Sequence, residues 1–115
     1  MLIRSQDKRM IVNFENICTA SAFPKKDSED IYVEDGTGSL MVGRYSTKAK
    51  AMKVLDMIQE AYGDSEYTKY VIPEVCRMLS MKPKTEENKA HAEELGEMLK
   101  KGMTFQMPED SEVEA

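Results

Sequence analysis

The segment from Ser46 to Gly63 constrains the fold most, because its hydrophobic residues recur every three or four positions. This spacing predicts an amphipathic helix over 46–62, with Ser46 as its N-cap and Gly63 as its end. We expect its apolar face to cover a β-sheet formed by the residues before it, with Leu55 and Ile58 at the centre of the packing. That face consists of Ala51, Met52, Leu55, Ile58, Ala61 and Tyr62.

The first 45 residues have the pattern of short strands. Residues 2–4 form a short apolar start, and residues 10–15 alternate between an apolar and a mixed face. The two segments are close enough in sequence to predict a hairpin. A weaker strand is expected over 17–23, followed by a polar loop. A second hairpin is predicted from 31–33 and 40–42, because the Asp35-Gly36 pair between them favours a tight turn.

Beyond Gly63 the pattern favours shorter elements. Residues 67–72 have strand propensity, and Pro73 is a suitable first residue for a short helix. A further helix is predicted over 86–101, where acids near the start and lysines near the end suit the helix dipole. An alternating stretch over 103–107 predicts an edge strand that returns to the sheet.

Together these patterns predict one α+β domain over residues 1–108. Its antiparallel sheet has five or six strands covered by the single amphipathic helix, and a helical insertion at about 73–102 precedes the last strand. A length of 115 residues suits a single domain. We expect residues 109–115 to form a free, flexible acidic tail.

Charge and hydropathy exclude some classes of protein. The formal net charge is −5, and the four acids of 109–115 leave residues 1–108 at −1. This balance disfavours general nucleic-acid binding, which needs many lysines and arginines. The sequence contains no apolar run of ~18 residues, so it predicts no membrane span. The first eight residues become charged too soon for a signal peptide, so a cytoplasmic location is expected.

Three patches resemble a group of small proteins from Firmicutes and their phages. They are the opening MLIRSQDK with Val12-Asn13, the block GRYSTK at 43–48 with AMKVLDMIQE at 51–60, and the ending FQMP at 105–108 with DSEV at 110–113. The resemblance covers about a third of the chain. It implies a bacterial or phage origin and a small cytosolic protein, and it transfers no catalytic residue.

The start of the predicted helix 46–62 is the first candidate site. Arg44, Lys48, Lys50 and Lys53 lie within ten residues, and no acid occurs between Asp35 and Asp56. Lysines at a helix start oppose the dipole, and a bound anion would reverse that effect. An anion such as a phosphate or a nucleotide could be held by Arg44, Ser46, Thr47 and Lys48. The alternative is a basic face turned toward water.

Ten methionines in so small a domain suggest a second candidate site. Methionine fills irregular cores, and it also suits adaptable contact surfaces. A core of this size has difficulty holding all ten. We therefore predict a partner-binding surface, with packing of the helical insertion onto its own sheet as the alternative. Its residues would be Met78, Leu79, Met81 and Met98.

No set of residues predicts catalysis or a bound cofactor. Cys18, Cys76 and the single histidine, His91, are too few and too scattered for a zinc site. A Cys76–His91 nucleophilic pair is a remote hypothesis, since no residue is marked out to orient the histidine. The glycines at 36 and 38 precede a strand and not a helix, so a hairpin explains them better than a phosphate loop.

The leading hypothesis is therefore a non-enzymatic protein that binds and modulates a protein partner or associates with itself. A phage or mobile-element accessory, such as an inhibitor of a host system, would have this size. The alternative from another class is a binder of a small anion at the start of the helix 46–62. We predict no metal site and no catalytic residues.

Overall fold

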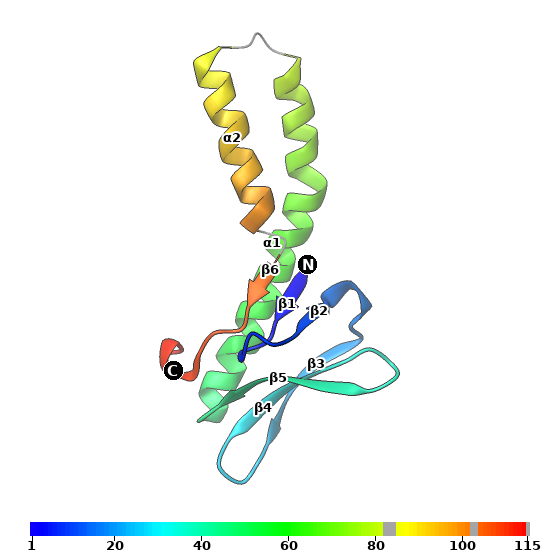
Figure 1. Cartoon of the computed structure of the whole chain (residues 1–115), viewed down its shortest axis with the longest axis vertical. Coiled ribbons are helices and arrows are strands. Elements are labelled where there is room, and N and C mark those ends of the chain that lie inside the picture. Colours follow the sequence, from blue (N-terminus) through cyan, green and yellow to red (C-terminus); the bar gives the residue numbers. More distant parts are fainter. Residues whose placement is uncertain (82–84, 102–103, 115) are drawn as a thin grey trace.

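Two small sheets and one long helix share a single core in the computed structural model of the chain. The structure describes residues 1–81, 85–101 and 104–114, without the side chains of 72, 76, 79, 95 and 98–101. The molecule is elongated, with extents of 61 × 32 × 22 Å. Its sheets lie at one end, and a pair of helices projects from them to form the other end (Figure 1).

The first sheet joins the two ends of the chain. It contains β1 (Leu2–Arg4), β2 (Ile11–Asn13) and β6 (Thr104–Gln106) in the order β2-β1-β6. β1 runs antiparallel to β2, as the predicted hairpin requires, and parallel to β6. Ile3 and Val12 oppose each other and are buried, whereas their neighbours along each strand are exposed. The period-two pattern over 10–15 therefore identified the buried face of β2 correctly.

The second sheet is an antiparallel meander. It contains β3 (Thr19–Pro24), β4 (Glu29–Glu34) and β5 (Ser39–Tyr45) in the order β3-β4-β5. Ile31 and Val33 turn toward the core and are almost fully buried. The short helical turn η1 (14–16) leads from the first sheet into β3.

The predicted turn at Asp35-Gly36 is confirmed. Gly36 has a φ of 93°, a left-handed conformation that costs glycine little. The Asp35 carboxylate accepts hydrogen bonds from the backbone amides of Thr37 at 2.9 Å and Gly38 at 3.2 Å. A side chain that bonds to the backbone two and three residues ahead stabilises a turn.

Strand β5 contains a register irregularity and, at Gly43, a close approach of its backbone to two side chains. The register shifts between Ile31, which pairs with Gly43, and Tyr32, which pairs with Met41. A Cβ atom on Gly43 would lie 3.0 Å from the Met107 side chain and 3.0 Å from the Tyr45 ring. The backbone approaches these side chains closely because position 43 has none.

The sheet prediction was wrong in its extent. We expected one antiparallel sheet of five or six strands, but the described strands form two sheets of three, and one pairing is parallel. The chain leaves the first sheet at η1, between β2 and β3, and builds the second sheet from β3 to β5. After the pair of helices it returns to the first sheet, where β6 pairs parallel with β1.

Helix α1 (Lys48–Ser80) is about twice as long as predicted. Gly63 and Pro73 lie inside it, and the predicted strand over 67–72 is helical. The buried face of the helix continues beyond Tyr62, but with polar residues. Ser65 and Thr68 are buried at helical spacing, and Val71 is half-buried. Packing of the second half against α2 outweighs the local preference for a strand.

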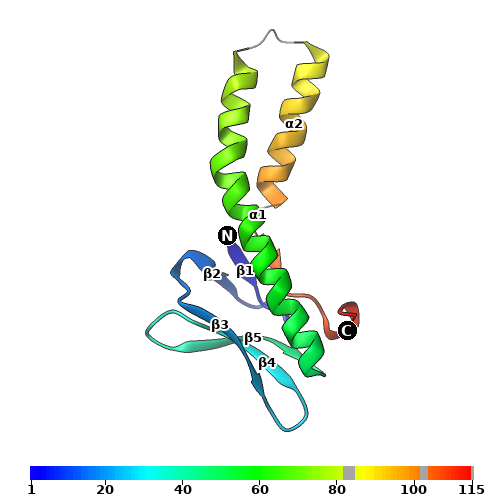
Figure 2. The same cartoon turned by 180° about the vertical axis from the view of Figure 1, so that it is seen from behind.

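Helix α2 (Glu86–Lys101) has the predicted bounds. The Thr85 hydroxyl accepts a hydrogen bond from the Asn88 amide at 3.2 Å and caps its start. α2 packs against α1, and the two form a hairpin that extends away from both sheets (Figures 1 and 2). The predicted insertion is therefore a projecting arm and not a layer on the sheet. Its predicted end, Gly102, lies outside the described residues.

The core lies between both sheets and the first half of α1, which crosses them diagonally (Figure 2). Ile58 is buried, as predicted. Leu55 is only half-buried, and Val54, which the sequence pattern did not single out, has no exposed surface. The buried hydrophobic residues are Ile3, Val12, Ile31, Val33, Val42, Tyr45, Ala51, Val54, Ile58, Met107 and Val113.

The C-terminal segment is not the free tail that we predicted. Residues 110–112 form a helical turn, η2, and Val113 is only 4% exposed. The Tyr45 hydroxyl donates to the Pro108 carbonyl at 2.8 Å in the core. A buried valine and this hydrogen bond hold the segment, although its acids made it look fully solvated. Within the described residues, no helix has the length and apolarity needed to cross a bilayer.

Truncation of the core should distinguish the two faces of α1. We expect Ile58→Ala to lower the free energy of unfolding by about 2–5 kcal/mol, because it leaves a cavity between α1 and the sheets. Leu55→Ala should have a smaller effect, because Leu55 is half-exposed before the change. Chemical denaturation of both variants tests this order, and an equal or larger effect of Leu55→Ala would contradict it.

Candidate functional site

The four residues predicted to hold an anion lie next to one another, where β5 leads into α1. Thr47 caps the helix, since its hydroxyl accepts from the Lys50 amide at 3.1 Å. Ser46 was expected in that role, but it lies one position too early. Lys48 is the first residue of α1, and its side chain is exposed.

Arg44 is already paired within the chain. Its Nε lies 3.1 Å from Asp30 Oδ1 and its Nη2 lies 3.3 Å from Asp30 Oδ2, so the contact is bidentate. Burial alone would raise the pKa of Asp30, but hydrogen bonds from Arg44 and Ser28 and the charge of Arg44 outweigh it and lower the pKa. The pair neutralises a buried carboxylate, because the side chain of Asp30 is only 1% exposed.

An anion does occupy the start of α1, and it belongs to the chain itself. Asp110 Oδ1 accepts from the Ser46 amide at 2.7 Å. Lys50 Nζ lies 2.9 Å from the Asp110 carbonyl oxygen and 3.4 Å from its Oδ2. The hydrogen bond from the Ser46 amide is the largest cause of a lowered Asp110 pKa, and Lys50 adds to it.

A second lysine holds the same segment. Lys53 Nζ donates to the Glu114 carbonyl at 2.6 Å. Lys50 and Lys53 were expected to face water unless an anion was bound, and both instead contact residues 110–114. The sequence contained the signal for this contact, because a helix start rich in lysine and free of acids complements an acidic tail without bases.

The described part of the predicted partner surface is exposed. Met78 is 59% exposed and Met81 79% exposed. The side chains of Leu79 and Met98, the other two predicted residues, lie outside the described residues. The structure adds Tyr67 and Tyr70, which are 58% and 67% exposed and which we had assigned to a strand.

Three of these exposed side chains, Tyr67, Tyr70 and Met78, share one face of the projecting half of α1. At 3.6 residues per turn they fall within an arc of about 80°. Met81 follows directly after the last helical residue, Ser80, and we call the four residues together the apolar stripe. Helical periodicity would have aligned them from sequence alone, had the strand propensity of 67–72 not taken precedence in our prediction.

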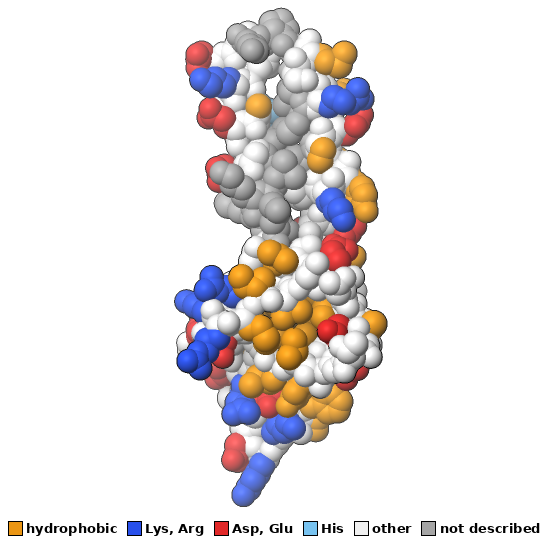
Figure 3. All heavy atoms as spheres, turned by 45° about the vertical axis from the view of Figure 1, so that its right-hand side comes forward, with side chains coloured by type: hydrophobic (Ala, Val, Ile, Leu, Met, Phe, Trp, Pro, Cys, Tyr) orange, Lys and Arg blue, Asp and Glu red, His pale blue; other side chains and the backbone are white. Residues whose placement is uncertain are grey.

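Charges of both signs lie within and beside the apolar stripe, since Glu74 falls on the same face between Tyr70 and Met78. Arg77 forms an ion pair with Glu74, one turn before it. Lys69 Nζ lies 5.5 Å from the centre of the Tyr70 ring. Figure 3 shows this limb of the hairpin, where hydrophobic side chains alternate with charged ones. Isolated exposed hydrophobic residues are ordinary, but an aligned series of large ones is typical of an interaction surface.

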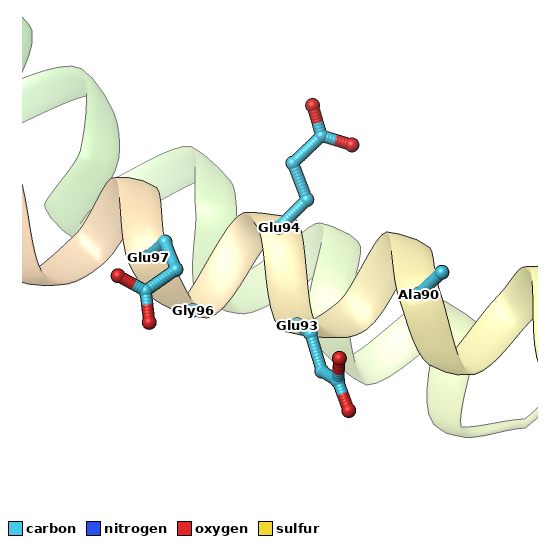
Figure 4. A pocket seen from close by; sticks show the side chains of 5 residues that line it. All are labelled: Ala90, Glu93, Glu94, Gly96 and Glu97. Atoms are coloured by element: carbon cyan, nitrogen blue, oxygen red, sulfur yellow. The ribbon is translucent and has the colours of Figure 1, made fainter.

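The described side chains of α2 offer no comparable site. A shallow hollow on α2 is lined by Glu93, Glu94 and Glu97, with Ala90 and Gly96 beside them. The three carboxylates point in different directions and do not converge on one point (Figure 4). Among the described residues, no group of three or more acids, histidines or cysteines could hold a metal ion.

The cysteine hypotheses gain no support from the described residues. Cys18 is exposed and its thiol is free. The side chain of Cys76 lies outside the described residues, so the structure does not test its pairing with the exposed His91. The glycines at 36 and 38 lie in the β4–β5 turn, as the hairpin interpretation predicted.

Comparisons with protein-family models, with curated proteins and with solved structures gave no match to this chain. The functional argument therefore depends on its own surfaces.

The pair between Arg44 and Asp30 should stabilise the second sheet. We expect Arg44→Ala to lower the free energy of unfolding by about 1–3 kcal/mol, because it leaves a buried carboxylate with fewer donors. Arg9→Ala is a suitable control, since Arg9 is exposed. Chemical denaturation at neutral pH compares the two. Equal effects would show that the pair contributes nothing beyond the loss of a surface charge.

The contact of Asp110 with α1 should weaken in acid. Because folding lowers the pKa of Asp110, its contribution is complete above the unfolded pKa of about 3.9 and is lost as the pH falls through the folded value. Asp110→Asn removes the charge but keeps an oxygen acceptor. We expect thermal unfolding to depend more steeply on pH below about 4 in the unchanged chain than in Asp110→Asn.

Amide hydrogen exchange offers a local readout of the same contact. Asp110→Ala removes the acceptor of the Ser46 amide. That amide should exchange faster in Asp110→Ala than in Asp110→Asn. Equal exchange rates would show that residues 110–114 do not hold the start of α1 in solution.

Proposed function

We propose that this chain is a non-enzymatic binding protein that docks a protein partner along the apolar stripe. One observation carries the proposal. Four large, strongly exposed hydrophobic side chains lie along a helical arm that projects away from the rest of the fold, three of them on one face of α1 and Met81 just beyond its end. Such an arm offers a surface without disturbing the core.

The character of the apolar stripe indicates the kind of partner. Two tyrosines and two methionines give a surface that combines rigid rings with adaptable chains, and both occur often at interfaces. Neighbouring charges of both signs favour a partner whose apolar groove or helix is bordered by mixed charges. In keeping with its resemblance to proteins of Firmicutes and phages, we propose an accessory role, such as inhibition of a host protein.

The alternative function, capture of a small anion at the start of α1, is less well supported. A carboxylate of the chain already accepts the hydrogen bond from Ser46 and contacts Lys50. Arg44, which was expected to contribute charge, is committed to Asp30. An incoming phosphate would have to displace residues 110–114 before it could bind.

Charge placed on the apolar stripe should abolish binding. We expect Met78→Lys combined with Met81→Lys to lose a partner that the unchanged chain captures from its native host, because two ammonium groups would have to be desolvated on docking. Met52→Lys provides a matched control, since Met52 is 45% exposed on the same helix but lies far from the stripe. Quantitative affinity capture with all three chains measures the difference.

Two results would overturn this proposal. One is a partner that both the stripe variant and the control retain equally, which would place docking elsewhere. The other is the absence of any enriched partner with the unchanged chain. Circular dichroism of each variant should show unchanged helix content, because the substituted side chains are exposed in the folded chain.

A further inference from the structure

Strand β3 is the open edge of the second sheet. It is the outer strand in the order β3-β4-β5, and no strand among the described residues pairs with its other side. With six residues it is twice as long as β2 or β6, the edge strands of the first sheet. A long edge strand presents a row of backbone donors and acceptors to any strand that approaches.

The opposite edge of the same sheet is covered. The Gln6 amide donates to the Val42 carbonyl at 2.8 Å, and the Arg44 amide donates to Gln6 Oε1 at 2.8 Å. Gln6 Nε2 donates back to the Arg44 carbonyl at 3.0 Å. Gln6 therefore makes the backbone hydrogen bonds at β5 that a neighbouring strand would make. The outer edge of β3 has no such partner among the described residues.

The sequence of β3 has little of the usual protection of an edge, because only Pro24 at its end blocks pairing. Its residues, TASAFP, include no charged side chain. Edge strands are commonly protected by lysines or other charges, which resist the approach of another strand. Ala20, Ser21 and Ala22 are small and half-buried, so they shield the backbone little.

We propose that β3 pairs antiparallel with β3 of a second copy of this chain. A two-fold axis would join the two meanders into one six-stranded sheet. A second copy fits because the uncharged strand meets no like charge when it faces its own reversed sequence. This contact is separate from the apolar stripe and does not depend on the function proposed above.

Proline fixes the register of the pairing. Pro24 has no amide hydrogen, so the ladder ends before it and leaves residues 19–23, with Ser21 at their centre. Ser21 then faces Ser21 of the second copy, and Phe23 faces Thr19. Phe23 is 50% exposed beside Tyr32, with ring centres 5.9 Å apart, and pairing covers it with the threonine methyl.

The contact is small. A ladder of five residues covers less than the roughly 800 Å² per partner of a standard interface. We therefore expect a reversible dimer whose fraction rises with concentration, and not a permanent one.

Disulfide trapping tests the register directly. Ser21→Cys, with Cys18 and Cys76 replaced by serine, places two thiols across the axis. Opposed residues of antiparallel strands have Cα atoms about 4.5–5.5 Å apart, within the range of a disulfide. We expect mild oxidation to give a covalent dimer rapidly.

Cys18 is a control that the chain itself supplies. In the proposed register the two Cys18 residues lie six positions apart, roughly 20 Å, so Cys76→Ser alone should cross-link much more slowly. Equal trapping of Cys18, or no trapping through Ser21→Cys, would overturn the proposal.

Sedimentation equilibrium of the unchanged chain gives the second measurement. The apparent mass should rise toward that of a dimer as the concentration approaches about 1 mM, and Ser21→Lys should keep the chain monomeric. A monomer at every concentration, or a dimer that Ser21→Lys leaves intact, would contradict the proposal. So would a dimer that only Met78→Lys with Met81→Lys dissociates, which would assign self-association to the apolar stripe.

Discussion

Burial of one face of the first half of α1 is the constraint on which the rest of the structure depends. Ala51, Val54 and Ile58 of α1 pack in the core shared with two sheets of only three strands each, and such small sheets need a covering helix to be stable. The same burial fixes the direction of the helix. Because the second half of α1 continues along that direction beyond the sheets, the core decides where the exposed arm points.

Electrostatic contacts at the start of α1 hold the C-terminal residues 110–114 against the fold. Basic side chains at a helix start oppose the helix dipole, and the Asp110 carboxylate offsets part of that cost by accepting from the Ser46 amide and contacting Lys50. Main-chain carbonyls of Asp110 and Glu114 also accept from Lys50 and Lys53. The arrangement returns residues 110–114 to the middle of the sequence and helps to bury Val113. It also separates the two candidate sites, because the anion position is filled internally while the hydrophobic residues of the arm stay exposed.

Sequence patterns were reliable where one periodicity acted alone. The hairpin around Gly36, the bounds of α2 and the burial of Ile58 are all confirmed. Prediction failed where signals competed. Strand propensity over 67–72 and the presence of Gly63 and Pro73 suggested breaks, yet contacts with α2 keep the segment helical. Half of the candidate partner surface, Tyr67 and Tyr70, was therefore missed.

The sequence alone determined the α+β class, the local turns, the amphipathic helix and the complementary charges of helix start and tail, because each depends on residues close in the chain or on composition. Only the tertiary structure decided that the strands divide into two sheets, that β6 runs parallel to β1, and that Asp110 reaches Ser46. These features depend on pairing between distant segments, whose geometry is set by how the whole chain packs and not by any local pattern.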